Sequence, residues 1–330
     1  MIVHDKLYGN FRMEGVAYEI INTKSFQRLK GIGMAGYELF IDKSHPFSKL
    51  KANRYEHSVG VFILLTKLGA NLEERIAGLL YDFSILALSH IGDCVYGRFE
   101  TQDFHDEIRE GFIRNSEIPS ILRKFGIDVN EVVDETKFGL LERKLPDLCA
   151  DRLDYSLRHL IEIGKISRGE AKEILDSLIV VNNEIVFSDK EAAKNFAWLY
   201  FFLNKNYYCC PMQATLFKLI SDAVKIGIKK GILTQRDLFE TDYTIYRKLK
   251  NSGDQEIEEL LETIRHLEVK EVERDYDMIL KTKVRWVDPK VLVKGKLLRI
   301  SEFDKKYTKE VKRWIRKAKR GFKVKILKKI

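Results

Sequence analysis

The scarcity of proline is the feature of this sequence that most constrains its fold. Only five prolines occur among 330 residues, and proline is the main residue that breaks a helix interior. Apolar residues also recur at helical spacing along most of the chain. This periodicity predicts helices over residues 54–68, 72–91, 102–115, 117–125, 193–204, 216–231 and 256–267. We therefore expect a mainly α protein.

A further helix is predicted after Pro146, because proline is favoured in the first turn of a helix. The segment LPDLCADRLDYSLRHLIEIG (residues 145–164) keeps helical periodicity throughout. In one continuous helix, five side chains would share a face: Asp147, Asp151, Asp154, Tyr155 and Arg158. Three of the five are carboxylates, so this face is a candidate for binding a cation.

The pattern changes in two places, where strands are expected instead. The segment IVVNNEIVF (residues 179–187) has two β-branched runs around Asn182-Asn183, which is typical of a β-hairpin with a tight turn. From residue 268 onward, apolar and polar residues alternate. We therefore expect a helical domain over residues 1–265 and a small C-terminal α+β appendage over residues 266–330.

Positive charge is concentrated in the last part of the chain. Residues 305–330 contain thirteen Lys and Arg but only one acidic residue, Glu310, so this basic tail carries +12 and residues 1–304 about −3. Within residues 309–319, a helical stripe of apolar side chains comprises Val311, Trp314, Ile315 and Ala318. Two interpretations stay open: the stripe docks a helix whose charges are solvated, or the charges contact nucleic acid or nucleotide phosphates.

Cysteine spacing and hydropathy bear on the compartment. Cys94, Cys149 and the adjacent Cys209 and Cys210 form no C-x-x-C pair, which favours a reduced protein. The most apolar stretch, residues 76–88, is too short to span a bilayer. We therefore expect a cytoplasmic protein that does not associate with membranes.

Residue types that bind metals recur at several positions on the predicted helices. They are His57, Asp82, His90, the pair His105-Asp106, and Asp151. Asp82 is surrounded by apolar residues, where an unpaired carboxylate would be costly, so it needs a metal, a cation or an amide as a partner. Imidazoles with carboxylates suit Mn²⁺, Fe²⁺ or Zn²⁺, and carboxylate oxygens also suit Mg²⁺. A histidine on an apolar helix can equally be a hydrogen-bonded core residue, and this alternative stays open.

The order of these motifs resembles the HD-domain phosphohydrolase superfamily. The segments QRLKGIG, NRYEHSVGV, LLYDFSILALSH, FHDE and CADRLDYSLRH carry the resemblance, and HDKLYGNF and RWVDPKVL extend it over most of residues 4–290. The chain is most similar to the dNTP triphosphohydrolases of the SAM- and HD-domain branch. The resemblance implies an HD-domain helical bundle with a short β-hairpin and the C-terminal appendage.

The resemblance also implies a role for each matched residue. The expected metal ligands are His57, Asp82 and Asp151. The expected catalytic residues, on the phosphate side of the site, are His90, His105 and Asp106. The expected substrate-binding residues are Arg54, Arg152, Tyr155 and Arg158.

The chain departs from the family pattern within LLYDFSILALSH. Tyr81 replaces the histidine of the HD pair, Ile85 replaces a second histidine that aids catalysis, and Leu86-Ala87 replace a Gly-Pro kink. His159 also stands where many members carry an aspartate near the ribose. Tyr81 either fills space as a neutral phenol or binds the metal as a phenolate. We favour the space-filling interpretation, because a neutral phenol is a poor metal ligand. The apolar replacements predict a straighter helix here.

We therefore expect a metal-dependent phosphohydrolase that acts on a nucleotide with weakened activity. The cofactor would be one divalent metal, Mn, Mg, Fe or Zn, at reduced occupancy, and the protein would be a homo-oligomer. The alternative is a non-catalytic HD protein that binds nucleotide or nucleic acid and acts by regulation or oligomerisation. A purely structural module is the weakest hypothesis, because the candidate ligands are present together.

Overall fold

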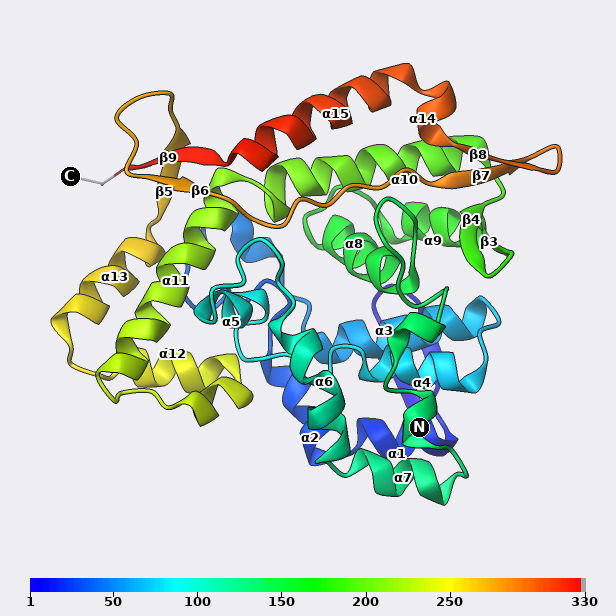
Figure 1. The fold of residues 1–330 in the computed structure, drawn as a ribbon, viewed down its shortest axis with the longest axis horizontal. Helices are drawn as coiled ribbons and strands as arrows, with labels where there is room; N and C mark the ends of the chain where they lie inside the picture. Colours follow the sequence, from blue (N-terminus) through cyan, green and yellow to red (C-terminus); the bar gives the residue numbers. More distant parts are fainter. Residues whose placement is uncertain (328–330) are drawn as a thin grey trace.

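The computed structural model describes residues 1–327, and it is mainly helical (Figure 1). The helices are α1 (Gly15–Ile21), α2 (Lys24–Gln27), α3 (Arg54–Lys67), α4 (Leu72–Leu80), α5 (His90–Val95), α6 (Phe104–Arg114), α7 (Ile118–Lys124), α8 (Ala150–Glu162), α9 (Arg168–Asp176), α10 (Lys190–Leu203), α11 (Pro211–Lys229), α12 (Asp242–Lys250), α13 (Gln255–Arg265), α14 (Ile300–Phe303) and α15 (Lys305–Arg320). The prediction of a mainly α protein is confirmed.

The strands form three small sheets. The first is the hairpin of β1 (Ile2–Asp5) and β2 (Gly9–Arg12). The second has the order β3-β4-β7-β8, from β3 (Leu178–Val181), β4 (Glu184–Phe187), β7 (Lys290–Val293) and β8 (Lys296–Arg299). The third has the order β5-β9-β6, from β5 (Glu268–Glu271), β6 (Met278–Leu280) and β9 (Phe322–Leu327).

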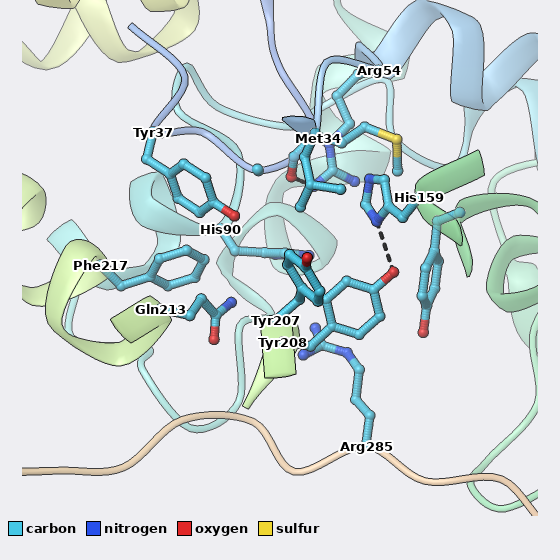
Figure 2. A pocket seen from close by; sticks show the side chains of 13 residues that line it. Met34, Tyr37, Arg54, His90, His159, Tyr207, Tyr208, Gln213, Phe217 and Arg285 are labelled. Carbon is cyan, nitrogen blue, oxygen red and sulfur yellow. Dashed lines mark hydrogen bonds between the residues drawn. The ribbon is translucent and has the colours of Figure 1, made fainter. Parts of the chain in front are cut away.

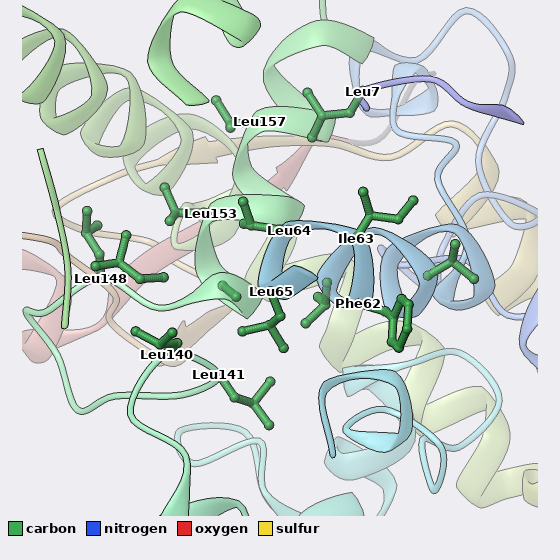
Figure 3. Close-up of a cluster of buried hydrophobic side chains, with 14 of the residues drawn as sticks. Leu7, Phe62, Ile63, Leu64, Leu65, Leu140, Leu141, Leu148, Leu153 and Leu157 are labelled. Carbon is green, nitrogen blue, oxygen red and sulfur yellow. The ribbon is translucent and has the colours of Figure 1, made fainter. Parts of the chain in front are cut away.

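Helix α3 lies at the centre of the helical part and packs against α4 and α8. Its first turn is fixed by a capping box, in which Asn53 and Glu56 each accept a hydrogen bond from the other's backbone N–H. Beyond that turn, residues 57–65 are all buried. Figure 3 shows the apolar side chains of α3 among Leu153 and Leu157 of α8. The capping fixes where α3 begins, and the packing fixes its face toward α8.

The predicted hairpin is confirmed. Strands β3 and β4 pair antiparallel, and Asn182 and Asn183 turn the chain between them with φ of 52° and 59°. Asparagine tolerates this left-handed conformation better than most residues do. Strand β4 also pairs with β7 at Phe187 and Val291, across the boundary predicted at residue 265. That domain boundary stays a prediction.

The prediction of one continuous helix over residues 72–91 is wrong. The prediction that this helix is straighter than its counterpart in the family is wrong as well. Helix α4 ends at Leu80, the chain turns through residues 81–89, and α5 begins at His90. Leu88 and Ser89 have φ of 65° and 52°. The Leu88 N–H donates to Asp242 Oδ1 at 2.6 Å, which holds the turn from a distant part of the chain. Asp82 and His90 therefore do not share one helix face.

The start predicted for the helix after Pro146 is also wrong. Helix α8 begins at Ala150, whose N–H donates to the Leu140 carbonyl at 2.7 Å. Asp147 lies in the turn that precedes the helix, so it does not share the helical face of Asp151 and Asp154.

The apolar stripe of the basic tail docks on the body, as one of the two interpretations predicted. In α15, Val311, Trp314 and Ala318 are buried, and Trp314 packs edge-on against Phe201 of α10 at 5.8 Å between ring centroids. The Lys and Arg side chains of α15 are exposed. The nucleic-acid contact, which would use this exposed outer face, stays a prediction. Residues 328–330 of the tail lie outside the described residues.

Among residues 1–327, no helix combines the length and the apolar character needed to cross a bilayer.

We predict that Gly36→Ala destabilises the protein because Gly36 packs against the turn of residues 81–89. A Cβ at Gly36, which has φ of +80°, would lie 2.1 Å from the Leu88 carbonyl oxygen. Gly69 has a similar φ of +76°, and a Cβ there would meet no atom within 4 Å, so it is the matched control. Both substitutions incur the left-handed penalty of about 1–2 kcal/mol. Gly36→Ala should lower the free energy of unfolding by roughly 1–3 kcal/mol more than Gly69→Ala does. Equal losses of unfolding free energy, measured with denaturant, would contradict the proposed close packing.

Candidate active site

His57 of α3 lies among three carboxylates. Its Nε2 atom is 3.0 Å from Asp151 Oδ1 and 3.5 Å from Asp82 Oδ2, and its Nδ1 atom is 2.7 Å from Asp154 Oδ2. Asp151 and Asp154 come from α8, and Asp82 from the turn after α4. The structure thus brings together the three residues predicted as metal ligands. Burial lowers the pKa of His57, but hydrogen bonds to Asp151 and Asp154 outweigh it and raise this pKa to about 9.

A buried ion network fixes the orientation of the His57 ring. Arg158 Nε donates to Asp154 Oδ2 at 2.8 Å, and Arg158 Nη2 donates to Asp5 Oδ2 at 2.7 Å. Asp154 therefore receives hydrogen bonds from both Arg158 and His57 Nδ1. This arrangement keeps a proton on Nδ1 and directs Nε2 toward Asp82 and Asp151.

Asp82 has the partner that its apolar surroundings require. Arg54 Nη1 donates to Asp82 Oδ2 at 2.7 Å, and Arg54 Nε donates to Ser89 Oγ at 2.9 Å. Burial raises the pKa of Asp82, but the positive charges of Arg54 and His57 outweigh it, so this pKa is well below its usual range. Asp82 is therefore ionised and able to bind a cation.

A second cluster joins α5 to α6. Asp93 accepts hydrogen bonds from His90 Nδ1 at 2.9 Å and from His105 Nδ1 at 3.1 Å. Burial lowers the pKa of His105, but the Asp93 carboxylate outweighs it and raises this pKa. Burial dominates at His90, whose pKa falls to about 3. The His105 ring therefore stays protonated to a higher pH than the His90 ring.

Asp93 is a site residue that the sequence reasoning missed. It is completely buried and is one turn after His90 in α5. The spacing His90-x-x-Asp93 was a signal that could have identified it, because residues three apart in a helix are neighbours.

Both clusters open onto a polar cleft of about 320 Å³. The predicted site residues that line it are Arg54, Asp82, His90, His105, Asp106, Asp151, Arg152 and Tyr155. His57 lies behind this wall and is buried. Arg158 does not line the cleft, because its guanidinium is engaged by Asp154 and Asp5.

Tyr81 lines the cleft in place of the family histidine. Burial raises the pKa of its hydroxyl well above the usual range, so the phenol is neutral. The guanidinium of Arg109 lies over the Tyr81 ring, 4.8 Å from its centroid. These features favour the interpretation of Tyr81 as a space-filling ring. Ile85 is buried in the hydrophobic core and does not line the cleft.

An aromatic pocket adjoins the polar cleft (Figure 2). The lining residues that contribute rings are Tyr37, His90, Tyr155, His159, Tyr207, Tyr208 and Phe217. His159 Nδ1 is 2.7 Å from the Tyr208 hydroxyl, and burial lowers the pKa of His159 to about 3. Within residues 1–327, His159 Nε2 and Gln213 Oε1 are buried without a hydrogen-bond partner. Such atoms are costly unless a polar partner reaches them, and water or a polar ligand in the pocket would supply one.

The side chains around His57 fit a divalent cation by their donor chemistry. With a pKa of about 9, His57 is protonated near neutral pH, and a proton on Nε2 lies between two carboxylates. A cation can replace that proton, since ligation requires a neutral imidazole. Within residues 1–327, ligand atoms closer than 4.8 Å to one another occur in two more compact groups, His90-Asp93-His105 and Glu142-Cys149-Asp151. Asp151 belongs to the second group, whereas the predicted set of His57, Asp82 and Asp151 is neither of the two, so its role in binding a metal stays a prediction.

The chain is similar to known proteins along most of its length, although no family model matches the sequence. The uncharacterized protein YdhJ of Bacillus subtilis is 36% identical over 99% of this chain and 100% of its own length. The metal-dependent phosphohydrolase cns2 of Cordyceps militaris is 28% identical over 89% of this chain and 86% of its own length.

A more distant relative and a solved structure agree with this placement. A SAMHD1 homolog of Dictyostelium discoideum, named a deoxynucleoside triphosphate triphosphohydrolase, is 21% identical over 86% of this chain and 62% of its own length. A phosphohydrolase structure from Bacteroides thetaiotaomicron has the same fold, with a TM-score of 0.61 and 18% identity over 82% of this chain and 79% of that one. The chain therefore belongs to the HD-domain phosphohydrolases of the metal-dependent type.

Proposed function

We propose that this protein hydrolyses a phosphate ester of a nucleotide. The observation that carries the proposal is the aromatic pocket, with unpartnered polar atoms on His159 and Gln213, opening onto the polar cleft. A nucleoside offers a flat base and hydrogen-bonding edges to such a pocket, and its phosphate would then lie in the cleft. Arg54, His90, Tyr155 and Arg285 line both cavities and mark their junction.

His57, Asp82 and Asp151 would hold one divalent cation. When bound, the cation supplies Lewis-acid polarisation of a phosphoryl oxygen and lowers the pKa of a water molecule. Asp154 and Arg158 act as positioning residues, because they hold the His57 ring with Nε2 toward Asp82 and Asp151. The name of cns2, a metal-dependent phosphohydrolase, supports the presence of a metal here.

His105 is the proposed general acid. Asp93 accepts a hydrogen bond from its Nδ1 atom and favours the protonated ring, while the other nitrogen, Nε2, lies 3.6 Å from Asp106 Oδ1. A water oxygen attacks phosphorus, the phosphorus–oxygen bond to the leaving group breaks, and His105 Nε2–H gives its proton to the departing oxygen. The attacking water releases its proton to solvent, and His105 regains a proton from solvent. Asp106 is proposed to orient His105 from the cleft side.

Three residues are proposed to bind the phosphoryl group from the helical wall. Arg54 and Arg152 supply guanidinium donors, although each is already paired, with Asp82 at 2.7 Å and with Glu142 at 3.0 Å. His90, which is neutral and donates its one N–H from Nδ1 to Asp93, is proposed to accept a hydrogen bond at Nε2 from a protonated phosphoryl oxygen. Tyr155, whose hydroxyl is 2.6 Å from that of Tyr200, is proposed to pack beside the sugar.

We propose that hydrolysis is slow. Tyr81 supplies a neutral phenol where a metal-ligating imidazole is expected, and Ile85 supplies no proton-transfer group. General acid–base help contributes typically about 10²–10⁴-fold, so the loss of one histidine leaves a measurable rate. Nucleotide binding without turnover is the second candidate function, favoured by the same two replacements.

The proposal predicts metal-stimulated hydrolysis in a panel of dNTPs, NTPs, nucleoside monophosphates and phosphodiesters with Mn²⁺, Mg²⁺, Fe²⁺ or Co²⁺. His57→Ala and Asp82→Ala should abolish the rate, and His105→Ala should lower kcat by roughly 10²–10⁴-fold. Glu107→Gln, an exposed site on α6, is the control. If no substrate turns over, yet calorimetry shows nucleotide binding that is lost in Arg54→Ala, binding without catalysis replaces hydrolysis.

Metal content provides an independent prediction. Protein purified without chelator should contain metal, and Asp151→Ala should lower its occupancy as measured by elemental analysis. Tyr81→His should raise occupancy, because an imidazole replaces a neutral phenol beside Asp82. Identical substoichiometric metal in the wild type and Asp151→Ala would show that these side chains hold no metal.

The pH dependence tests the role of Asp93. Because the acid His105 must be protonated, the rate falls as pH rises through its pKa. Asp93 raises that pKa, so Asp93→Asn should move the alkaline limb of the pH–rate profile to lower pH. Titration of the His105 ring by NMR should show the same shift without substrate, whereas Glu107→Gln should leave it unchanged. An unmoved His105 pKa in Asp93→Asn would refute the assignment.

A further inference from the structure

One wall of the polar cleft comes from an extended segment near the carboxyl end, residues 281–288, which we name the strap. Figure 1 shows it as part of the orange trace that connects β6 with β7. Its ends are held by different sheets, since β6 pairs with β9 and β7 pairs with β4 and β8. Lys283 and Arg285 of the strap line the cleft opposite residues of the helical part. Neither was predicted as a site residue.

The strap is tied to the helical part at Gln102. Gln102 Oε1 accepts a hydrogen bond from Arg285 Nη2 at 2.6 Å, and its Nε2 lies 3.4 Å from Thr282 Oγ1. Gln102 is buried and has φ of 51°, a conformation that residues other than glycine rarely adopt. Backbone strain of this kind persists where surrounding contacts fix it, commonly at functional sites. Because Gln102 precedes α6, the tie places the strap close to His105.

The carboxyl end of the strap is also fixed. Val287 is buried, and its carbonyl accepts a hydrogen bond from the Tyr307 hydroxyl at 2.5 Å. The Asp288 N–H donates to the Pro146 carbonyl at 2.9 Å. Lys283 and Arg285 are therefore carried by a segment that is held on both sides.

The cations of the strap differ from the three arginines of the helical part that line the cleft, and from Lys144, which also lines it but is exposed. Arg54, Arg143 and Arg152 each pair with a carboxylate. By contrast, Lys283 and Arg285 form no ion pair within 4.0 Å anywhere in residues 1–327, although both are half-buried. Burial and the charge of Arg285 lower the pKa of Lys283 to about 8. Asp106 and Glu142 act on Lys283 only from beyond ion-pair distance, so two like charges that lack a direct partner favour the binding of an anion.

The position of the two cations indicates which part of a ligand they contact. Arg285 lines both the cleft and the aromatic pocket, and Figure 2 shows it extending from the strap toward Tyr207 and Tyr208. Lys283 lines the cleft alone. An anion bound between the two cations would lie next to the aromatic pocket on its Arg285 side. It would face the side chains around Asp82 across the cleft.

We propose that Lys283 and Arg285 bind the phosphoryl oxygens of the substrate, so that the strap and the helical wall together form the phosphate site. The inference rests on the proposed function for the identity of the substrate, but anion binding itself does not require catalysis. Arg285, which spans both cavities, contacts the phosphate nearest the nucleoside. Lys283 contacts oxygens farther along the cleft.

The test measures binding of orthophosphate, pyrophosphate and tripolyphosphate by calorimetry in the absence of metal. Lys283→Met and Arg285→Gln should each lower the affinity for the best-bound anion by roughly 10- to 100-fold, the usual range for the loss of a charge-assisted hydrogen bond. Lys283→Arg should retain binding because it keeps the charge. Lys281→Met, at an exposed position of the same strap, is the matched control and should bind like the wild type. The anion with the highest affinity shows how many phosphoryl groups the cleft holds.

Thermal unfolding separates a binding role from a structural one. Removing a half-buried charge that forms no direct ion pair should leave the Tm of Lys283→Met equal to that of the wild type or higher, although anion binding falls. A lower Tm together with unchanged anion affinity would overturn the proposal, because Lys283 would then be structural. Failure of the wild type to bind any of the three anions would overturn it as well.

Kinetics distinguish this inference from the proposed function. If Lys283→Met and Arg285→Gln lose anion affinity but no nucleotide is hydrolysed by any variant, the phosphate site stands and the proposed hydrolysis fails. If the wild type hydrolyses a nucleotide and both variants keep its KM and kcat, the proposed function stands and the strap site fails. If the proposed hydrolysis and the strap phosphate site are both correct, KM should rise in Lys283→Met and Arg285→Gln more than kcat falls.

Discussion

The candidate active site depends on the buried ion network centred on His57. Asp5 of β1, Arg158 and Asp154 of α8, and His57 of α3 form a continuous chain of hydrogen-bonded charges. Buried charges are destabilising unless each has a partner, and here every member has one. The network thus joins the amino-terminal hairpin, α3 and α8, and it orients His57 toward two of the carboxylates that we assign to the metal. Fold and chemistry depend on the same contacts.

The sequence predicted those elements whose signals are local. Helix α3 begins at Arg54, as the apolar periodicity predicted, and the β3–β4 turn forms at Asn182-Asn183. The motif around His57 and the motif of α8 also implied that their side chains meet, although they are 94 residues apart at His57 and Asp151. That inference came from the family resemblance, since no periodicity within either helix specifies its neighbour.

The features that were mispredicted or missed depend on distant parts of the chain. The apolar run that includes Leu88 has the composition of a helix, but Asp242, 154 residues away, accepts the Leu88 N–H and holds a turn instead. An apolar run cannot show which long-range hydrogen bond will interrupt it. Lys283 and Arg285 were missed for a related reason. Most lysines and arginines in a sequence are solvated, and only the tie to Gln102 distinguishes Arg285 from them.

The position of the strap in the sequence has a consequence for the order in which the cleft is built. His57, Asp82 and Asp151 are all synthesised before residue 160, whereas the strand that holds β6, β9, spans Phe322–Leu327. Domains of a growing polypeptide fold from the amino end as they emerge from the ribosome. In a nascent chain, the residues around His57 therefore precede the wall of the cleft that carries Lys283 and Arg285. Completion of that wall is a late event in biogenesis.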